Sequence, residues 1–203
     1  ESTPITSNLP PGDLYARSKR EAEEVARGIE RTRGLSVTIV RPAAVYGERD
    51  RLLIPALETL LRLPIVPRLG PATNTLPVVY AGNVADAIDL VLRAARGGET
   101  FDIGLDYPLT QRELLDTLAA ALGRSPRFLT LPGALATGAA RLLFACGVTT
   151  SGAKQLSLRR IVRLALGENP YPSERIRSEL GWDPPHHHSE ALARAGRWLN
   201  EHR

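Results

Sequence analysis

The sequence is poor in the residues that mark secreted, disulfide-bonded or membrane-spanning proteins. It holds one cysteine, Cys146, so it cannot form an internal disulfide, and this fits a reducing compartment. The stretch nearest to a membrane span, 131–148, is interrupted by Arg141 and by glycines. The first residues, from Glu1 to Pro4, carry neither the basic nor the apolar part of a secretion signal. We therefore expect a cytoplasmic protein.

Methionine is absent, lysine is rare and the net charge is small. The chain of 203 residues has no methionine and does not begin with one, so we expect it to be a piece of something longer. A net charge of +4 without any run of like charges argues against nucleic-acid binding. With 43% hydrophobic and 24% charged residues, the composition is typical of one globular domain, or of a core with a small lobe.

The stretch from Asp13 to Gly34 carries the strongest chemical signal. Its apolar positions recur at helical spacing, which predicts a helix with Tyr15 and Lys19 on one face. A neighbouring cation favours phenolate, so Tyr15 is a candidate acid/base for an alcohol oxygen. An exposed helix with an accidental pair is the alternative. Against it, 24 of the 26 basic residues are arginine, and arginine cannot replace the compact ammonium of Lys19 beside hydroxyls.

The order of predicted elements favours an α/β fold with a parallel sheet. A helix followed by a strand at 35–40 is half of a β-α-β unit. Arg41-Pro42 is expected to end that strand, and 43–47 to form a loop at its carboxyl end, where open α/β sheets bind ligands. A plain strand-to-helix turn is the alternative for this loop. Further helices are predicted at 51–63, 83–97, 110–122, 133–146, 153–166, 173–180 and from 189 on, with Asn83, Ser173 and Ser189 as N-caps and a capping box at Thr110 and Glu113; strands are predicted at 64–71, 76–81, 100–103 and 128–131.

Few other side chains suggest chemistry. The adjacent histidines 186–188 follow two prolines, and adjacent loop residues rarely aim at one ion, so we predict no metal site. Arg68 could meet an anionic substrate group, although a solvated arginine is the favoured alternative. Cys146 has no basic neighbour and is expected to be inert. The phosphate-binding pattern Gly-x-Gly-x-x-Gly does not occur.

Four motifs in order resemble the extended short-chain dehydrogenase/reductase family, also called the NAD-dependent epimerase/dehydratase family. They are Tyr15-Ala-Arg-Ser-Lys19, Ile39-Val-Arg-Pro-Ala-Ala-Val-Tyr-Gly47, residues 78–87, and Leu180-Gly-Trp-Asp-Pro184. The segment 78–87 is similar to the 3β-hydroxysteroid dehydrogenase-like branch, in which an asparagine stands where many sugar-nucleotide epimerases carry an aspartate. The resemblance runs from about Glu1 to the end of the chain.

The resemblance implies an α/β fold: the C-terminal part of a Rossmann-type doubly wound parallel sheet plus a small, mostly helical substrate lobe. Residues 1–47 would end the dinucleotide-binding domain, and 48–203 would form the substrate lobe interleaved with the last strands. The family's Gly-rich loop and its ribose-binding acid belong to an earlier half, so we expect this chain alone to bind cofactor poorly and to be inactive. The third catalytic residue would lie upstream of Glu1, and Ser2 is only a weak candidate for it.

The resemblance also implies roles for individual residues. Tyr15 would be the general acid/base on the substrate oxygen, and Lys19 would hold the nicotinamide ribose hydroxyls. Pro42 and Val45 would lie against the nicotinamide end of NAD or NADP. The hydride chemistry would belong to the cofactor.

The expected function is that of an NAD(P)-dependent oxidoreductase or epimerase acting on a secondary alcohol or ketone. Asn83 and the apolar stretch 131–148 favour a sterol-like or lipidic substrate over a nucleotide-sugar, which stays the alternative. There are two further alternatives: a non-catalytic dinucleotide-binding module of the same fold, and a peripheral membrane protein anchored by 131–148. We expect a small-molecule substrate and no nucleic-acid partner, and a homodimer stays open.

Overall fold

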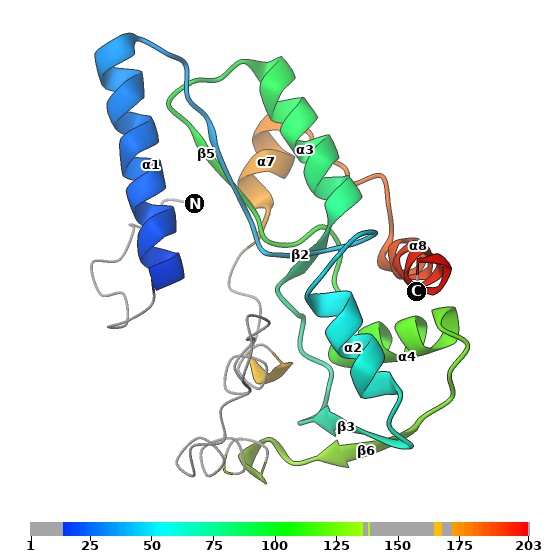
Figure 1. Cartoon of the computed structure of the whole chain (residues 1–203). Helices are drawn as coiled ribbons and strands as arrows, with labels where there is room; N and C mark the ends of the chain where they lie inside the picture. The colour runs from blue at the N-terminus through cyan, green and yellow to red at the C-terminus, as the bar shows by residue number, and fades with distance from the viewer. Residues whose placement is uncertain (1–13, 136–137, 139–164, 168–171, 203) are drawn as a thin grey trace.

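The structure, a computed structural model, describes residues 14–135, 138, 165–167 and 172–202. Its first element is α1 (Leu14–Arg33), which confirms the predicted helix. Gly34 ends it with φ at 65°, a left-handed conformation that costs glycine little. The chain then returns beside the helix as strand β1 (Ile39–Pro42), as Figure 1 shows.

Three pairs of parallel strands confirm the predicted parallel arrangement. β1 pairs with β5 (Thr100–Ile103), β2 (Ala44–Tyr46) with β4 (Val78–Tyr80), and β3 (Ile65–Leu69) with β6 (Arg127–Leu131). In every pair at least one helix separates the two strands along the chain, as a parallel connection requires. The return of β5 to β1 places a late strand beside the first one.

Five helices follow α1 among the described residues. They are α2 (Leu53–Leu61), α3 (Ala81–Ala94), α4 (Gln111–Ala121), α7 (Glu174–Leu180) and α8 (His188–Glu201). The predicted capping box is confirmed: the Thr110 hydroxyl accepts from the Glu113 N–H, and the Glu113 carboxylate accepts from the Thr110 N–H. The predicted helices at 133–146 and 153–166 fall mostly outside the described residues, as do Cys146 and Ser2.

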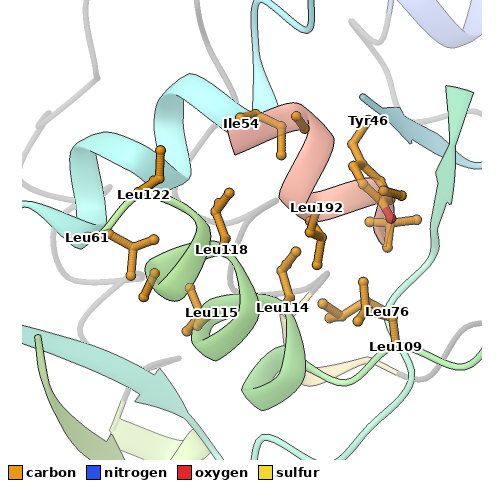
Figure 2. Close-up of a cluster of buried hydrophobic side chains, with 14 of the residues drawn as sticks. Tyr46, Ile54, Leu61, Leu76, Leu109, Leu114, Leu115, Leu118, Leu122 and Leu192 are labelled. Atoms are coloured by element: carbon orange, nitrogen blue, oxygen red, sulfur yellow. The ribbon is translucent and has the colours of Figure 1, made fainter. Parts of the chain in front are cut away.

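Two apolar clusters hold the elements together. In the larger one, Leu114 and Leu118 of α4 lie among Ile54 of α2 and Leu192 of α8 (Figure 2). Each fully buried leucine contributes about 1.5–3 kcal/mol through removal of apolar surface from water. The smaller cluster lies between α3, α7 and the β1–β5 pair and contains Val79, Val84, Ala87, Val91, Phe101, Ile103, Ile176 and Trp182.

The loop predicted over 43–47 is wrong in its middle, because 44–46 form β2. The Ala44 N–H donates to the oxygen of Pro77 at 3.1 Å, and the pairing depends on β4, which lies far along the chain. The strand predicted over 35–40 begins only at Ile39, and it ends at Pro42. Pro42 lacks an N–H, and the next bond to β5 comes from Ala43, which donates to Ile103 at 2.9 Å.

The predicted N-caps Asn83 and Ser189 are also wrong. α3 begins two residues before Asn83, and α8 begins one residue before Ser189 at His188. Ser173 does stand at the N-cap of α7, but its hydroxyl accepts from the N–H of Leu105 at 3.0 Å and not from the helix. The buried side chains of Asn83, Ser173 and His188 are held by distant partners, which local cap preferences cannot reveal.

Candidate active site

α1 is held to the β1–β5 pair by polar side chains. Arg27 donates to the main-chain oxygens of Val37 at 3.1 Å and Glu99 at 2.8 Å. One turn nearer the start of the helix, Glu23 accepts two hydrogen bonds from Arg41, at 2.9 and 2.6 Å. The earlier residue of α1 thus contacts the later residue of this segment: Glu23 contacts Arg41, whereas Arg27 contacts Val37. α1 and β1 therefore run antiparallel.

This direction places the start of α1 at the carboxyl end of β1. Lys19 lies four residues before Glu23, about 6 Å along the helix axis, whereas β1 ends one residue after Arg41. Tyr15 lies one further turn out. Figure 1 shows the start of α1 and the carboxyl end of β1 on the same side of this unit. Open α/β sheets bind ligands at this edge.

The structure brings Tyr15 and Lys19 together. The Nζ atom of Lys19 lies 5.6 Å from the centre of the Tyr15 ring, within the range of a cation–π contact. Tyr15 is 62% exposed and Lys19 is exposed too. Within the described part of the chain, Lys19 has no carboxylate at salt-bridge distance. Both side chains are therefore exposed on the surface that the described residues form.

Pro42 and Val45 extend this exposed edge at the ends of β1 and β2. Val45 is 41% exposed, whereas its neighbour Tyr46 is 1% exposed. Because successive side chains of a strand point to opposite faces, burial of Tyr46 turns Val45 outward. Pro42 is exposed as well, so the edge presents two apolar side chains.

A buried polar cluster beneath β2 was not predicted from the sequence. The Asp106 side chain accepts hydrogen bonds from the N–H groups of Tyr80 and Tyr107, both at 2.9 Å, and from the Asn83 amide at 2.8 Å. Its Oδ1 atom also lies 3.3 Å from Nε2 of His188. These donors satisfy a carboxylate that is 1% exposed. A lone aspartate after a strand gives no pattern from which this cluster could be inferred.

His188 connects this cluster to β2. Its Nε2 atom lies 2.8 Å from the main-chain oxygen of Tyr107, which can only accept, so Nε2 carries the hydrogen. In the neutral imidazole Nδ1 then has no hydrogen and accepts from the Tyr46 hydroxyl at 2.7 Å. Burial, with a further contribution from the charge of Asp106, raises the pKa of Tyr46, so that its hydroxyl keeps the proton that this bond needs.

Asn83 joins the same cluster to the segment before α8. Its amide donates to the main-chain oxygen of His186 at 2.7 Å and accepts from the His186 N–H at 3.0 Å. A neighbouring strand would make the same two bonds. The side chain is fully buried, so it holds the fold and does not face a ligand.

The first half of the chain matches a known family. The model of the NAD dependent epimerase/dehydratase family covers residues 1–104. The chain belongs to this family. This confirms the resemblance stated from the four motifs.

Curated relatives of this epimerase/dehydratase chain act on different substrates. The decarboxylating sterol-4-alpha-carboxylate 3-dehydrogenase of Saccharomyces cerevisiae is 34% identical over 108 residues, which are 48% of this chain and 31% of that protein. The 3beta-hydroxysteroid-dehydrogenase/decarboxylase isoform 2 of Arabidopsis thaliana is 30% identical over 189 residues, 85% of this chain and 33% of that one. A dTDP-glucose 4,6-dehydratase of Streptomyces niveus is 31% identical over 126 residues, 61% of this chain and 36% of that one.

Solved structures confirm the α/β fold of the Rossmann-type family. A dTDP-glucose 4,6-dehydratase from Streptomyces venezuelae, with NAD and TYD bound, aligns with a TM-score of 0.61 and 27% identity over 98% of this chain and 54% of that one. RMD from Pseudomonas aeruginosa, complexed with NADPH, aligns with a TM-score of 0.60 and 18% identity over 92% of this chain and 56% of that one. The second likeness shows the fold alone. The chain thus spans about a third of these curated relatives and about half of these solved chains.

In this epimerase/dehydratase chain Arg68 is buried, and the expectation of a solvated arginine is wrong. It is 8% exposed, pairs with Asp116 of α4, and lies 3.7 Å from the centre of the Phe128 ring. These contacts hold β3 and β6 against α4. A local pattern around Arg68 could not show this, since both partners lie more than 40 residues away.

Among residues 14–135, 138, 165–167 and 172–202, no three His, Cys, Asp or Glu side chains are grouped in a way that could hold a metal ion. Over the same part of the chain, no helix has both the length and the apolar character that crossing a bilayer demands.

Proposed function

We propose that this chain contributes the acid/base part of an NAD(P)-dependent oxidoreductase or epimerase that acts on a secondary alcohol or ketone. The observation that carries the proposal is the Tyr15–Lys19 pair, exposed at the carboxyl edge of β1 in a chain of this family. The relatives named above are dehydrogenases and dehydratases, which supports this class of reaction.

The exposed residues fit the nicotinamide end of a dinucleotide. The Lys19 ammonium offers three N–H donors to ribose hydroxyls. Pro42 and Val45 offer an apolar surface for one face of a flat ring. We assign these three residues and Tyr15 to cofactor contact. In this proposal phosphate-binding groups come from outside the chain, so the chain alone binds cofactor weakly and is inactive.

Tyr15 performs the proton transfer in this mechanism. When an alcohol is oxidised, the phenol oxygen takes the hydroxyl proton, and in the reverse direction it returns a proton to the carbonyl oxygen. The bound dinucleotide supplies the hydride acceptor or donor. Lys19, one turn away on the helix, orients the ribose beside Tyr15.

A sterol-like or other lipidic alcohol is the substrate class that we favour. Two of the relatives are named for sterol or hydroxysteroid dehydrogenation, and one of them aligns over 85% of this chain. A nucleotide-sugar is the second candidate, because dTDP-glucose 4,6-dehydratases are 31% identical in sequence and 27% identical in a solved structure. Asn83 itself does not separate the two, since its contacts are internal.

The test uses the protein as encoded, including any segment before Glu1, with NAD or NADP and with a 3β-hydroxysterol or dTDP-glucose. We expect turnover with the sterol. Tyr15→Phe should lower kcat by about 10²–10⁴-fold, the usual contribution of a general acid/base. Lys19→Arg should raise the KM for the dinucleotide, whereas the matched exchange Arg17→Lys on the same helix should not.

Two results would redirect the proposal. Turnover of dTDP-glucose without turnover of the sterol would select the nucleotide-sugar. Dinucleotide binding that is accompanied by no turnover, and that Tyr15→Phe leaves unchanged, would instead identify a non-catalytic dinucleotide-binding module.

A further inference from the structure

β2 has two exposed residues, Ala44 and Val45, and one residue that faces the core, Tyr46. Val45 is 41% exposed, and Tyr46 is 1% exposed among the leucines of the larger cluster. Figure 2 shows Tyr46 at one end of this cluster, on the side of Leu192 and away from Leu61. A strand cannot rotate one residue without its neighbour, so the position of Tyr46 sets the direction of Val45.

The Tyr46 hydroxyl has one hydrogen-bond acceptor among the described residues, Nδ1 of His188. The imidazole is fixed from its other side by the main-chain oxygen of Tyr107 and by the carboxylate of Asp106. Asp106 is in turn held by its three remaining donors. The bonds therefore run without a gap from the segment after β5, through His188, to β2.

This chain of bonds does not perform the chemistry itself. Tyr46 and Asp106 are each 1% exposed, and His188 is 6% exposed. None of the three can touch a substrate. Their common effect is to fix a strand whose other face is open.

We propose that His188 is a positioning residue: it fixes Tyr46 and thereby sets Val45 at the cofactor edge, in a way that depends on whether the imidazole is protonated. The proposal rests on the proposed function in one respect, namely that Val45 contacts the cofactor. The coupling between His188 and Val45 does not depend on that assignment.

Protonation of His188 reverses the bond to Tyr46. Nδ1 then carries a hydrogen and can only donate, so the buried Tyr46 hydroxyl loses its acceptor and must turn. A buried hydroxyl hydrogen that has no acceptor is costly, which favours a shift of the Tyr46 side chain and of β2. The test therefore covers the pH range in which imidazole side chains ordinarily change charge.

Charged and titratable groups face His188 from several elements. They are Tyr46 from β2, Asp106 and Tyr107 after β5, and Glu113 from the first turn of α4; His186, His187 and Glu190 are its neighbours along the chain. The carboxylates favour the protonated imidazole, and the loss of an acceptor for the Tyr46 hydroxyl hydrogen opposes it. The experiment must therefore report His188 and Val45 separately.

NMR of the protein as encoded can do this, with the histidine ring nitrogens and the valine methyl groups observed from pH 8 to pH 5. In the unaltered protein we expect the Val45 methyl signals to shift with the same midpoint as the His188 ring. In Tyr46→Phe, His188 should still titrate, and the Val45 shift at that midpoint should be lost. The control His187→Gln removes the exposed neighbouring histidine and should leave the Val45 shift intact.

A second variant keeps the test decisive if Tyr46→Phe does not fold. His188→Gln cannot titrate in this range, so the pH-dependent shift of Val45 should disappear while the spectrum keeps its dispersion. The proposal is overturned if His188 titrates and Val45 does not respond, or if Val45 responds equally in the variants.

Activity separates this inference from the proposed function. In a protein that turns over, His188→Gln should raise the KM for the dinucleotide about threefold to tenfold, the effect of one lost hydrogen bond, with kcat little changed. A protein that binds no dinucleotide but keeps the Val45 response would refute the proposed function and leave the coupling standing. A kcat loss with unchanged KM would overturn the positioning role.

Discussion

α1 and the α4–α8 pair are built in opposite ways. No residue of α1, from Leu14 to Arg33, is buried, and the helix is tied to the strands by hydrogen bonds of Arg27 and Glu23. α4 and α8 instead bury Leu118 and Leu192 completely. The helix that carries the candidate acid/base thus keeps its side chains available to a ligand, and the stability resides elsewhere. Residues open to ligands can be exchanged at little thermodynamic cost.

The largest expected difference between the two regions is in stability. Leu118→Ala removes a fully buried side chain of the larger cluster and should lower the free energy of unfolding by about 2–5 kcal/mol. Val25→Ala in α1, where the side chain is 62% exposed, should change it by less than about 0.5 kcal/mol. Urea unfolding of both variants measures the two values. Similar losses would show that α1 is part of the cooperative core.

Asn83→Asp should break the buried cluster and sharpen the contrast further. The new carboxylate would stand beside Asp106 and could no longer donate to Asp106 or to His186, so the loss should be about 2–4 kcal/mol at neutral pH. The like charge raises the pKa of the new acid, so the loss should shrink as the pH falls and the acid takes up a proton. Thermal unfolding at pH 7 and pH 5 tests this, with exposed Asn200→Asp as the control.

The cap of α4 should contribute less, and with a defined pH dependence. Thr110→Ala should cost about 1 kcal/mol at pH 7. The backbone N–H and then the hydroxyl of Thr110 hold the pKa of Glu113 below its ordinary value. A carboxylate whose pKa is lower in the folded than in the unfolded state stabilises the fold at pH values above the unfolded-state pKa. This stabilisation by Glu113 is lost as the pH falls through its folded-state pKa. Glu113→Gln should therefore differ from the unaltered protein at pH 7 and match it under strongly acid conditions.

The smallest expected effect concerns the attachment of α1. Glu23→Gln weakens the charge-assisted bonds to Arg41, both partners being partly exposed, and should cost about 0.5 kcal/mol. Hydrogen exchange should accelerate in α1 and stay unchanged in α4 and α8. A uniform acceleration would instead mean that α1 opens only when the whole molecule unfolds.

Elements with a local signal were predicted from the sequence. The period of the first helix, the β-branched run before Pro42 and the capping box at Thr110 each depend on residues near one another in the chain. The parallel pairing of the strands followed from their alternation with helices. The boundary near residue 47 and the cytoplasmic location stay predictions.

Features with distant partners could not be predicted. β2 exists because of β4, and Asn83 was assigned to a cap because its partners Asp106 and His186 lie 23 and 103 residues away. The buried bond between Tyr46 and His188 spans 142 residues. The Tyr15–Lys19 pair could be recognised in the sequence because both residues lie on one helix. Its chemical role stays a proposal.

The hydrogen bonds between Asn83 and the main chain of His186 determine which substitutions each of the two positions tolerates. The amide holds the peptide group of residue 186 and not its side chain, so nearly any amino acid can stand at that position. Proline is the exception, because it has no N–H to give. Position 83 tolerates far fewer residues, since its side chain must both donate a hydrogen bond to the main chain and accept one from it.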